Sequence, residues 1–132
     1  MGHVTYIYYE ILIYPNNTRT SHHKESAVST LAGKKYESFA EFYPFYLSEH
    51  ANRTCRRLHF AGSTLALLFL LTTLVSGNPW WLLAAIVSGY LFAWIGHFGF
   101  EKNRPATFKY PLYSLMGDWV MYSQLWRGKI PL

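Results

Sequence analysis

Three histidines and one carboxylate in this sequence have the residue types of a metal site, although they lie far apart along the chain. His59 and His97 each lie near one end of a long apolar run, and Glu101 follows His97 by four residues. Two imidazoles and a carboxylate are the ligands expected of a non-haem Fe(II) site, which keeps positions open for oxygen and substrate. His50 is a further candidate ligand. This chemistry requires a fold that brings the four side chains together.

The two apolar runs are predicted to be membrane-spanning helices, at about residues 58–75 and 80–98, because each is close to the length that crosses hydrocarbon. Residues 76–79, with the sequence SGNP, form a turn signal between them. When the second run folds back on the first, His59 lies opposite Gly96 and His97. If the second helix continues far enough, Glu101 shares a face with His97. The hairpin therefore predicts His59 and His97 at one membrane depth.

His50 reaches the same place only if the chain bends before the first span. On one continuous helix His50 and His59 would point in nearly opposite directions, because nine residues advance about two and a half turns. We place the bend at Asn52, whose side chain can cap a new helix by accepting from its free N–H groups.

Two amphipathic helices are predicted to flank the hairpin at the membrane surface, at about residues 36–50 and 112–126. In the first, which we expect Pro44 to interrupt, helical spacing puts four side chains on one face: Phe39, Tyr43, Tyr46 and His50. The second is rich in Trp and Tyr, which favours a position in the interface plane.

The composition supports a membrane protein of one domain. Of 132 residues, 51% are apolar and 14% charged, against about 25% charged in soluble domains. The net charge is +5, but the basic residues flank the apolar runs and form no patch for nucleic acid. Positive flanks with an uncharged turn predict that both ends of the hairpin are cytoplasmic. The single Cys55 excludes an internal disulfide.

The predicted fold is therefore an all-α membrane protein, a two-span transmembrane helical hairpin with flanking amphipathic interfacial helices. The domain covers residues 34–132. Residues 1–33 are polar and irregular, and we expect a poorly ordered or non-native N-terminal extension. The remaining histidines lie in this extension and are expected to be solvated: His3, His22 and His23.

Two long segments resemble a known family. FAEFYPFYLSEHANRTCRRLHFAGS and GYLFAWIGHFGFEKNRPATFKYPLYSLMGDWVMY closely resemble a small membrane family first catalogued as a domain of unknown function. A characterised fungal member is an Fe(II)-dependent 2-hydroxy fatty acid dioxygenase of the endoplasmic reticulum. The resemblance covers about Tyr36 to Tyr122, and EHANRTCRRLHFAG and GHFGFEKNRPATF are its most specific parts. The fungal member is expected to have more spans, and bacterial relatives of this compact size are common.

The resemblance implies fatty acid α-oxidation, in which a 2-hydroxy fatty acid loses one carbon with the use of molecular oxygen. The family's histidines map onto His50, His59 and His97, which would hold Fe(II), with Glu101 as candidate fourth ligand. The acyl chain would lie along the hairpin in lipid. The protein would reside in a bacterial inner membrane, or in the endoplasmic reticulum of a eukaryote.

Four further polar residues are candidates for supporting roles. Lys102 and Arg104 could grip the substrate carboxylate, although both also fit ordinary cytoplasmic flanking charge. Asn103 and Asp118 could orient imidazoles through their ring N–H groups. Asp118 could equally cap a loop or pair with a nearby arginine.

Two other interpretations of the sequence remain open. A non-catalytic membrane hairpin for lipid or protein interaction needs the same apolar runs and basic flanks, but not two histidines at one depth. Another metal-dependent lipid hydroxylase or hydrolase could use similar ligands. A homodimer is also expected, because two spans seal only a small cavity and Gly89, Ala93 and Gly96 offer a face of small residues.

Overall fold

The structure is a computed structural model that describes residues 35–132. The predicted extension at residues 1–33 and its three histidines lie outside the described residues. The described chain contains no strand, and its helices follow in this order: α3 (Phe39–Ser48), α4 (Arg53–Ser76), α5 (Trp80–Trp94), the π-helix η2 (Ile95–Glu101), the 3-10 turn η3 (Ala106–Phe108) and α6 (Pro111–Trp126). The all-α prediction is confirmed.

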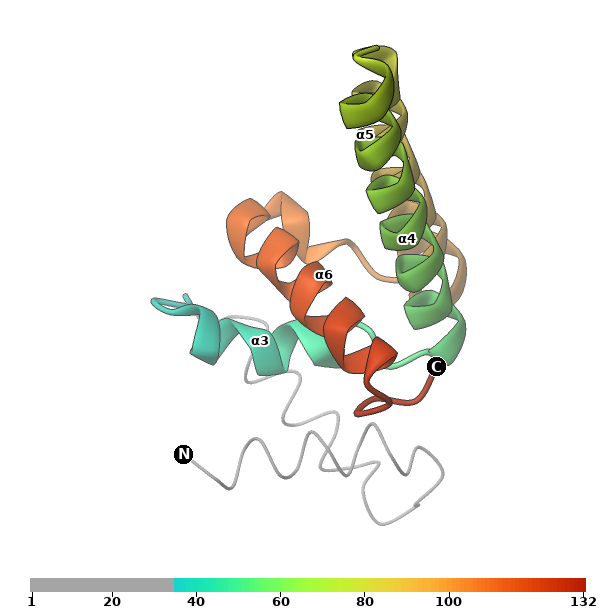
Figure 1. The fold of residues 1–132 in the computed structure, drawn as a ribbon. Helices are drawn as coiled ribbons and strands as arrows, with labels where there is room; N and C mark the ends of the chain where they lie inside the picture. Colours follow the sequence, from blue (N-terminus) through green and yellow to red (C-terminus); the bar gives the residue numbers. More distant parts are fainter. Residues whose placement is uncertain (1–34) are drawn as a thin grey trace.

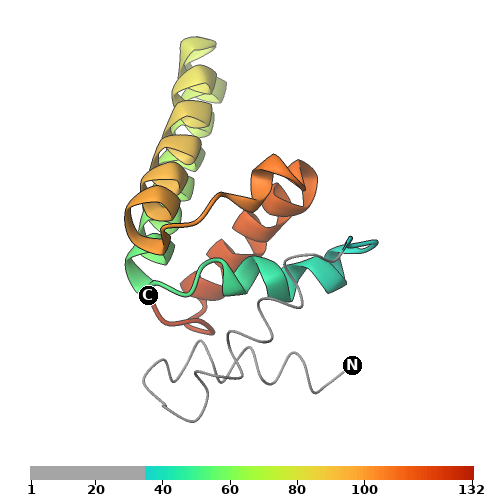
Figure 2. The ribbon, with the colours of Figure 1, turned by 180° about the vertical axis from the view of Figure 1, so that it is seen from behind.

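The helices form two parts that meet at one end of the hairpin. Helices α4 and α5 run antiparallel as a long arm, while α3 and α6 cross each other beside the base of that arm (Figure 1). The view from behind shows the same arrangement, with the tip of the hairpin extending beyond all other helices (Figure 2).

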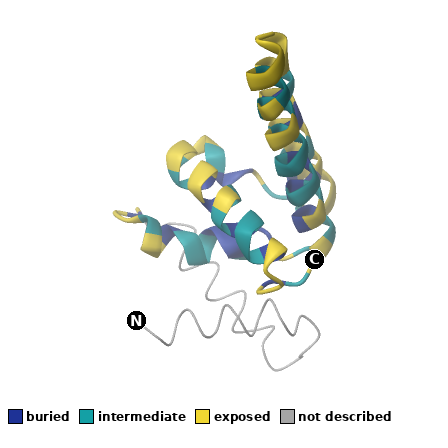
Figure 3. Cartoon of the chain, in the orientation of Figure 1, coloured by how far each residue is buried: buried dark blue, intermediate teal, exposed yellow. Residues whose placement is uncertain are grey.

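Both helical segments of the hairpin are long and apolar enough to cross a membrane. The candidate spans are Arg53–Ser76, with 24 residues, and Trp80–Glu101, with 22, so both are longer than the sequence predicted. Only 11% and 22% of their most apolar windows are buried within the chain, whereas the core helix of a soluble protein would be mostly buried. Exposed residues recur along the hairpin and cover its tip (Figure 3). An exposed apolar surface of this extent is typical of a membrane or protein interaction site.

The chain bends between α3 and α4 at the residue where the sequence predicted a bend. Asn52 has an extended backbone, and its side-chain oxygen accepts a hydrogen bond from the Thr54 N–H at 2.8 Å. It therefore caps α4. Pro44, in contrast, does not interrupt α3, which is one helix from Phe39 to Ser48. The carbonyl group that Pro44 leaves without an N–H partner belongs to Ala40, which is exposed and can be solvated.

The tip of the hairpin is the predicted turn. Gly77 adopts a left-handed conformation, with φ of 68°, and its N–H donates to the Thr73 carbonyl at 2.9 Å. A side chain would be strained at this φ, which is why glycine ends α4. The Asn78 side chain then accepts from the Trp80 N–H at 3.0 Å, at the start of α5.

Helices α3 and α6 pack through an aromatic and aliphatic core: Tyr36, Phe42, Tyr46, Leu47, Met121 and Leu125. Gly117 of α6 allows close packing, because a Cβ at this position would lie 2.8 Å from the Tyr46 ring. The opposite face of α6 exposes large apolar side chains, among them Leu112 and Trp126. An exposed apolar face on a short helix fits the predicted interfacial position.

Small residues set the spacing of the hairpin near its base, and this predicts the effect of one substitution. A Cβ at Gly96 would lie 2.8 Å from Cys55 Sγ and 3.4 Å from the Cys55 Cα. We expect Gly96→Ala to lower the free energy of unfolding by about 1–3 kcal/mol, as overpacking does. Thermal unfolding in detergent micelles measures this effect.

Gly99 provides a matched control, since it lies in the same π-helix and a Cβ there meets nothing within 4 Å. Gly99→Ala should be neutral or stabilising, because alanine is the better helix former. Equal melting temperatures for the two variants would contradict close packing at Gly96.

Candidate metal centre

Three buried imidazoles meet at the base of the hairpin. His50 follows α3, His59 lies in the second turn of α4, and His97 lies in the π-helix η2. Their ring centroids are 4.5 Å (His50–His59), 4.6 Å (His50–His97) and 5.2 Å (His59–His97) apart. Their side chains are only 1%, 6% and 2% exposed. The predicted meeting of His59 and His97 is thus present, and the bend at Asn52 brings His50 to the same point.

The tautomer of His50 follows from its hydrogen bond to the backbone. His50 Nδ1 lies 2.6 Å from the carbonyl oxygen of Tyr46, one turn earlier. A carbonyl oxygen can only accept, so Nδ1 carries the hydrogen. The lone pair of a neutral His50 is therefore on Nε2.

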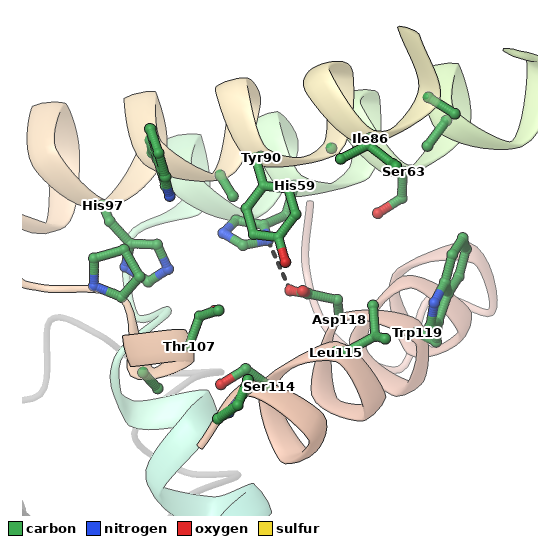
Figure 4. Close-up of a pocket in the computed structure, with 18 of the residues that line it drawn as sticks. His59, Ser63, Ile86, Tyr90, His97, Thr107, Ser114, Leu115, Asp118 and Trp119 are labelled. Carbon is green, nitrogen blue, oxygen red and sulfur yellow. Dashed lines mark hydrogen bonds and ion pairs between the residues drawn. The ribbon is translucent and has the colours of Figure 1, made fainter. Parts of the chain in front are cut away.

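His59 is held in the same way by a carboxylate. Its Nδ1 lies 3.0 Å from Asp118 Oδ1 (Figure 4). The same oxygen accepts a hydrogen bond from the Tyr46 hydroxyl. With Asp118 Oδ1 as the acceptor of both contacts, Nδ1 of His59 carries the hydrogen, and the lone pair of a neutral His59 is on Nε2. Asp118 thus makes the contact that the sequence analysis expected of it.

His97 has the third such partner. Its Nδ1 lies 2.8 Å from the Asn103 side-chain oxygen. The Asn103 amide nitrogen donates to the Glu49 carbonyl oxygen at 3.1 Å and to Glu49 Oε2 at 2.9 Å, which fixes the orientation of the amide. Nδ1 of His97 must then donate to the amide oxygen, and its lone pair is also on Nε2. The contact expected of Asn103 is present too.

These assignments leave lone pairs facing one another inside the protein. His50 Nε2 and His59 Nε2 are 3.2 Å apart, and in the neutral tautomers neither nitrogen carries a hydrogen. The pair is repulsive unless a cation lies between the two atoms. Two nitrogen ligands at about 2.0–2.1 Å from one ion are roughly 3.0 Å apart at an octahedral edge and 3.4 Å at a tetrahedral one. The observed separation lies in that interval.

Burial determines the charge states of His50 and Tyr46, which lie outside the candidate spans. It lowers the pKa of His50 well below its ordinary value, and the nearby His59 and His97 lower it further. His50 is therefore neutral at neutral pH, which is the form that binds metal. Burial also raises the pKa of Tyr46 well above its usual value, with a contribution from Asp118. The Tyr46 phenol thus stays protonated and donates to Asp118.

Cys55 is a member of the cluster that the sequence analysis did not propose. Ligand atoms of His50, Cys55, His59 and His97 all lie within 4.8 Å of one another, and the four residues could hold a metal ion. Cys55 precedes His59 by four residues on α4. This i, i+4 spacing is the signal that could have identified it.

Arg56 stabilises the backbone beside the metal-binding cluster. The sequence analysis treated it only as one of the basic residues that flank the apolar runs. Its side chain is 1% exposed. One guanidinium nitrogen donates to the carbonyl oxygens of His50 at 2.9 Å and Ala51 at 2.8 Å, and Nε donates to the Pro131 carbonyl oxygen at 3.0 Å. Arg56 thus fixes the backbone of His50.

The structure does not bring Glu101 into the cluster. Its carboxylate accepts a hydrogen bond from the Asn52 N–H at 2.6 Å, at the start of α4. Glu101 is the last residue of the π-helix η2, and this contact holds its carboxylate at the start of α4, away from the ligand atoms of the histidines. Lys102 and Arg104 are exposed, and neither lines the cavity beside the histidines.

A cavity of about 220 Å³ opens from the histidines between the hairpin and α6. Gly89 and Ala93, expected on a dimer face, line this cavity, while Gly96 packs against Cys55. Ser114 also lines it, and among the described residues its buried hydroxyl is the side-chain polar group without a hydrogen-bond partner.

The Asn103 contact predicts a loss of metal affinity. Asn103→Ala should weaken metal binding by about 10- to 100-fold, because the imidazole of His97 loses the acceptor that sets its tautomer and orientation. Competition with a chelator of known affinity measures the change.

Gln124→Ala is the matched control, since Gln124 accepts a hydrogen bond from the Tyr43 hydroxyl at 2.7 Å, in the contact between α3 and α6. It should leave the metal affinity unchanged. Equal affinities in the two variants would show that the Asn103 contact does not support the centre.

Comparison with known protein families identifies the family of this chain. A family model described as 2-hydroxy-palmitic acid dioxygenase Mpo1-like matches residues 36–130, a range that includes all three histidines and their hydrogen-bond partners. No curated protein and no solved structure matches the chain.

Proposed function

The chain belongs to the Mpo1-like family, and we propose that it is a membrane-bound non-haem iron dioxygenase that shortens 2-hydroxy fatty acids by one carbon. The bond between the first two carbons breaks, and the second carbon becomes the new carboxyl carbon. With atoms balanced, the acid and O₂ give the shorter acid, CO₂ and water. This reaction is a step of fatty acid α-oxidation.

One observation supports this proposal above the others: three imidazoles converge, and each has its Nδ1 hydrogen bonded to an oxygen acceptor. This is the arrangement of metal-binding histidines, because it directs every Nε2 lone pair to a common point. Imidazole suits iron among other transition metals, so the donor set fits Fe(II).

We assign the ligand role to His50, His59 and His97. Fe(II) bound there would supply the redox chemistry that O₂ requires and a Lewis acid for the 2-hydroxy and carboxylate oxygens. Tyr46, Asn103 and Asp118 orient the rings. The surrounding helices bury all three imidazoles and exclude water from them. Glu101, in this proposal, joins the end of η2 to the start of α4 and is not a ligand.

The remaining parts of the proposal concern the membrane. The hairpin crosses it with both ends cytoplasmic, in a bacterial inner membrane or the endoplasmic reticulum. Lys102 and Arg104 are exposed beside the end of the second candidate span, where cations contact anionic headgroups. The homodimer stays a prediction.

A non-catalytic hairpin is less well supported, because it would not require three buried histidines with matched partners. Another metal-dependent lipid hydroxylase or hydrolase needs the same centre, and the product of the reaction separates it from the dioxygenase.

The test is mass spectrometry of the products from 2-hydroxypalmitate, with purified protein, Fe(II) and O₂. We expect pentadecanoic acid to form, and to stop forming when O₂ is removed. Purified His97→Ala protein is the control for free iron in solution. Bound iron without any one-carbon-shorter acid would refute the dioxygenase, and a hydroxylated or hydrolysed product would support the alternative enzymes.

A further inference from the structure

The cavity beside the histidines is elongated along the hairpin. On α4 its lining runs from His59 to Leu70, and on α5 from Trp94 to Leu82. These stretches advance eleven and twelve residues, roughly 16–18 Å at about 1.5 Å per residue. One leaflet of a bilayer is about 15 Å of hydrocarbon, which is the length of a lipid acyl chain. The cavity is therefore as long as a fatty acyl chain.

The cavity is polar at one end and apolar at the other. The histidine end holds Asp118, Thr107 and Ser114, which face the same open space in Figure 4. Beyond Ser63 and Tyr90 the lining toward the tip of the hairpin is apolar, with Leu70, Leu82 and Ile86. This polarity matches a ligand that has one polar end and a long apolar tail.

Ser114 adds an independent sign of a ligand at the polar end. Its side chain is 2% exposed, and its hydroxyl has no hydrogen-bond partner among the described residues. A buried polar group without a partner costs free energy and is rare, so it points to a group that binds there.

The long side of the cavity is open between α5 and α6. Its rim carries large apolar side chains that are about half exposed: Ile86 52%, Tyr90 48% and Leu115 54%. The volume of about 220 Å³ is below the roughly 300–1,000 Å³ of pockets that enclose a ligand, so part of an acyl chain would remain in contact with lipid. The opening lets a chain enter sideways from the membrane.

From these observations we propose that the acyl chain of the substrate lies in this cavity, carboxyl end at the histidines, and that Gly89 and Ala93 of α5 determine which chain lengths fit. This inference rests on the proposed function. It replaces the expectation that the chain lies along the hairpin in lipid with a defined site between the hairpin and α6.

Gly89 is the position at which the inference can be tested without disturbing the packing. A Cβ at Gly89 meets nothing within 4 Å, so a larger side chain extends into the cavity and not into a neighbouring helix. Gly89 is eight residues from His97, roughly 12 Å along the axis, and Ala93 is one turn nearer.

The experiment measures binding of 2-hydroxyoctanoic, 2-hydroxydodecanoic and 2-hydroxypalmitic acid to the iron-loaded protein without O₂. Gly89→Leu should weaken 2-hydroxypalmitate binding by about tenfold or more, because displacing one to two methylene groups of the ligand from an apolar site costs about that factor in affinity. Binding of 2-hydroxyoctanoate should not change. Ala93→Leu should weaken all three acids. Gly99→Leu, outside the cavity, is the matched control and should change none.

Ser114→Ala tests the polar end. Because the hydroxyl has no partner in the protein, its removal should not lower the melting temperature or the iron content, while the affinity for all three acids should fall severalfold.

The outcomes separate this inference from the proposed function. Suppose that the acids bind the wild type, and that their relative affinities are the same in the wild type, Gly89→Leu and Ala93→Leu. This result would overturn the cavity as the acyl site and would not affect the proposed dioxygenase activity. If no acid binds iron-loaded wild type, both fail. A chain-length shift in the two α5 variants, with no one-carbon-shorter product, would support the acyl site and refute the dioxygenase.

Discussion

Replacing His59 with alanine should leave the purified protein with almost no bound iron. The substitution removes one of three converging Nε2 atoms and also frees the Asp118 carboxylate from the imidazole, 3.0 Å away. The loss in affinity should exceed the roughly 10- to 100-fold that accompanies loss of a supporting partner. Elemental analysis of the purified variant, and titration with Fe(II) without O₂, measure it.

Ser63→Ala is the control for this substitution. Ser63 lies one turn after His59 on α4 and also faces the cavity, but it is not part of the metal-binding cluster. It should bind iron like the wild type. If His59→Ala protein kept a native circular dichroism spectrum and full iron occupancy, the iron would be bound at another site.

Arg56→Ala should be among the most destabilising single substitutions in this chain. Three backbone carbonyl oxygens, those of His50, Ala51 and Pro131, lose their guanidinium donor, and a buried volume becomes empty. Of these acceptors the His50 carbonyl oxygen is the buried one, and a buried acceptor left without a donor costs about 1–3 kcal/mol. Together with the emptied volume, the expected loss in unfolding free energy is roughly 3 kcal/mol or more. Iron content should also fall, because the backbone at His50 is no longer held.

The neighbouring Arg57 supplies the comparison. Arg57 is exposed, and its guanidinium has one long contact, 3.4 Å to the Leu132 carbonyl oxygen. Arg57→Ala should change stability by no more than about 0.5 kcal/mol. Thermal unfolding in detergent micelles measures both variants. Equal melting temperatures for Arg56→Ala and Arg57→Ala would contradict the structural role of Arg56.

The hairpin and the pairing of its histidines could be predicted from the sequence because both follow from local rules. Two apolar runs joined by an uncharged turn define antiparallel helices, and equal distance from the turn puts His59 beside His97. The position of His50 followed from one capping residue, since Asn52 starts a new helix and so redirects the chain.

The misplaced residues depend on features without a local signal. The Glu101 carboxylate is held by the Asn52 N–H at the start of α4, and a helical count from His97 cannot anticipate that contact. Arg56 and Arg57 are identical in type and adjacent, yet only tertiary contacts make one a buried donor and the other a flanking charge. The cavity needs α6 folded against the hairpin, and no pattern in the sequence places that helix.

The three histidines come from three segments, and this has a consequence for the lifetime of the chain. An ion held by His50 and His59 would close a loop of nine residues, and His97 as a further ligand would join the end of the second span to both. Binding to the folded state alone stabilises it in proportion to the logarithm of the free ion concentration. When the ion is scarce, the base of the hairpin should open first and expose backbone to proteases. The supply of metal would then set how much of the protein a cell retains, as well as how much of it is active.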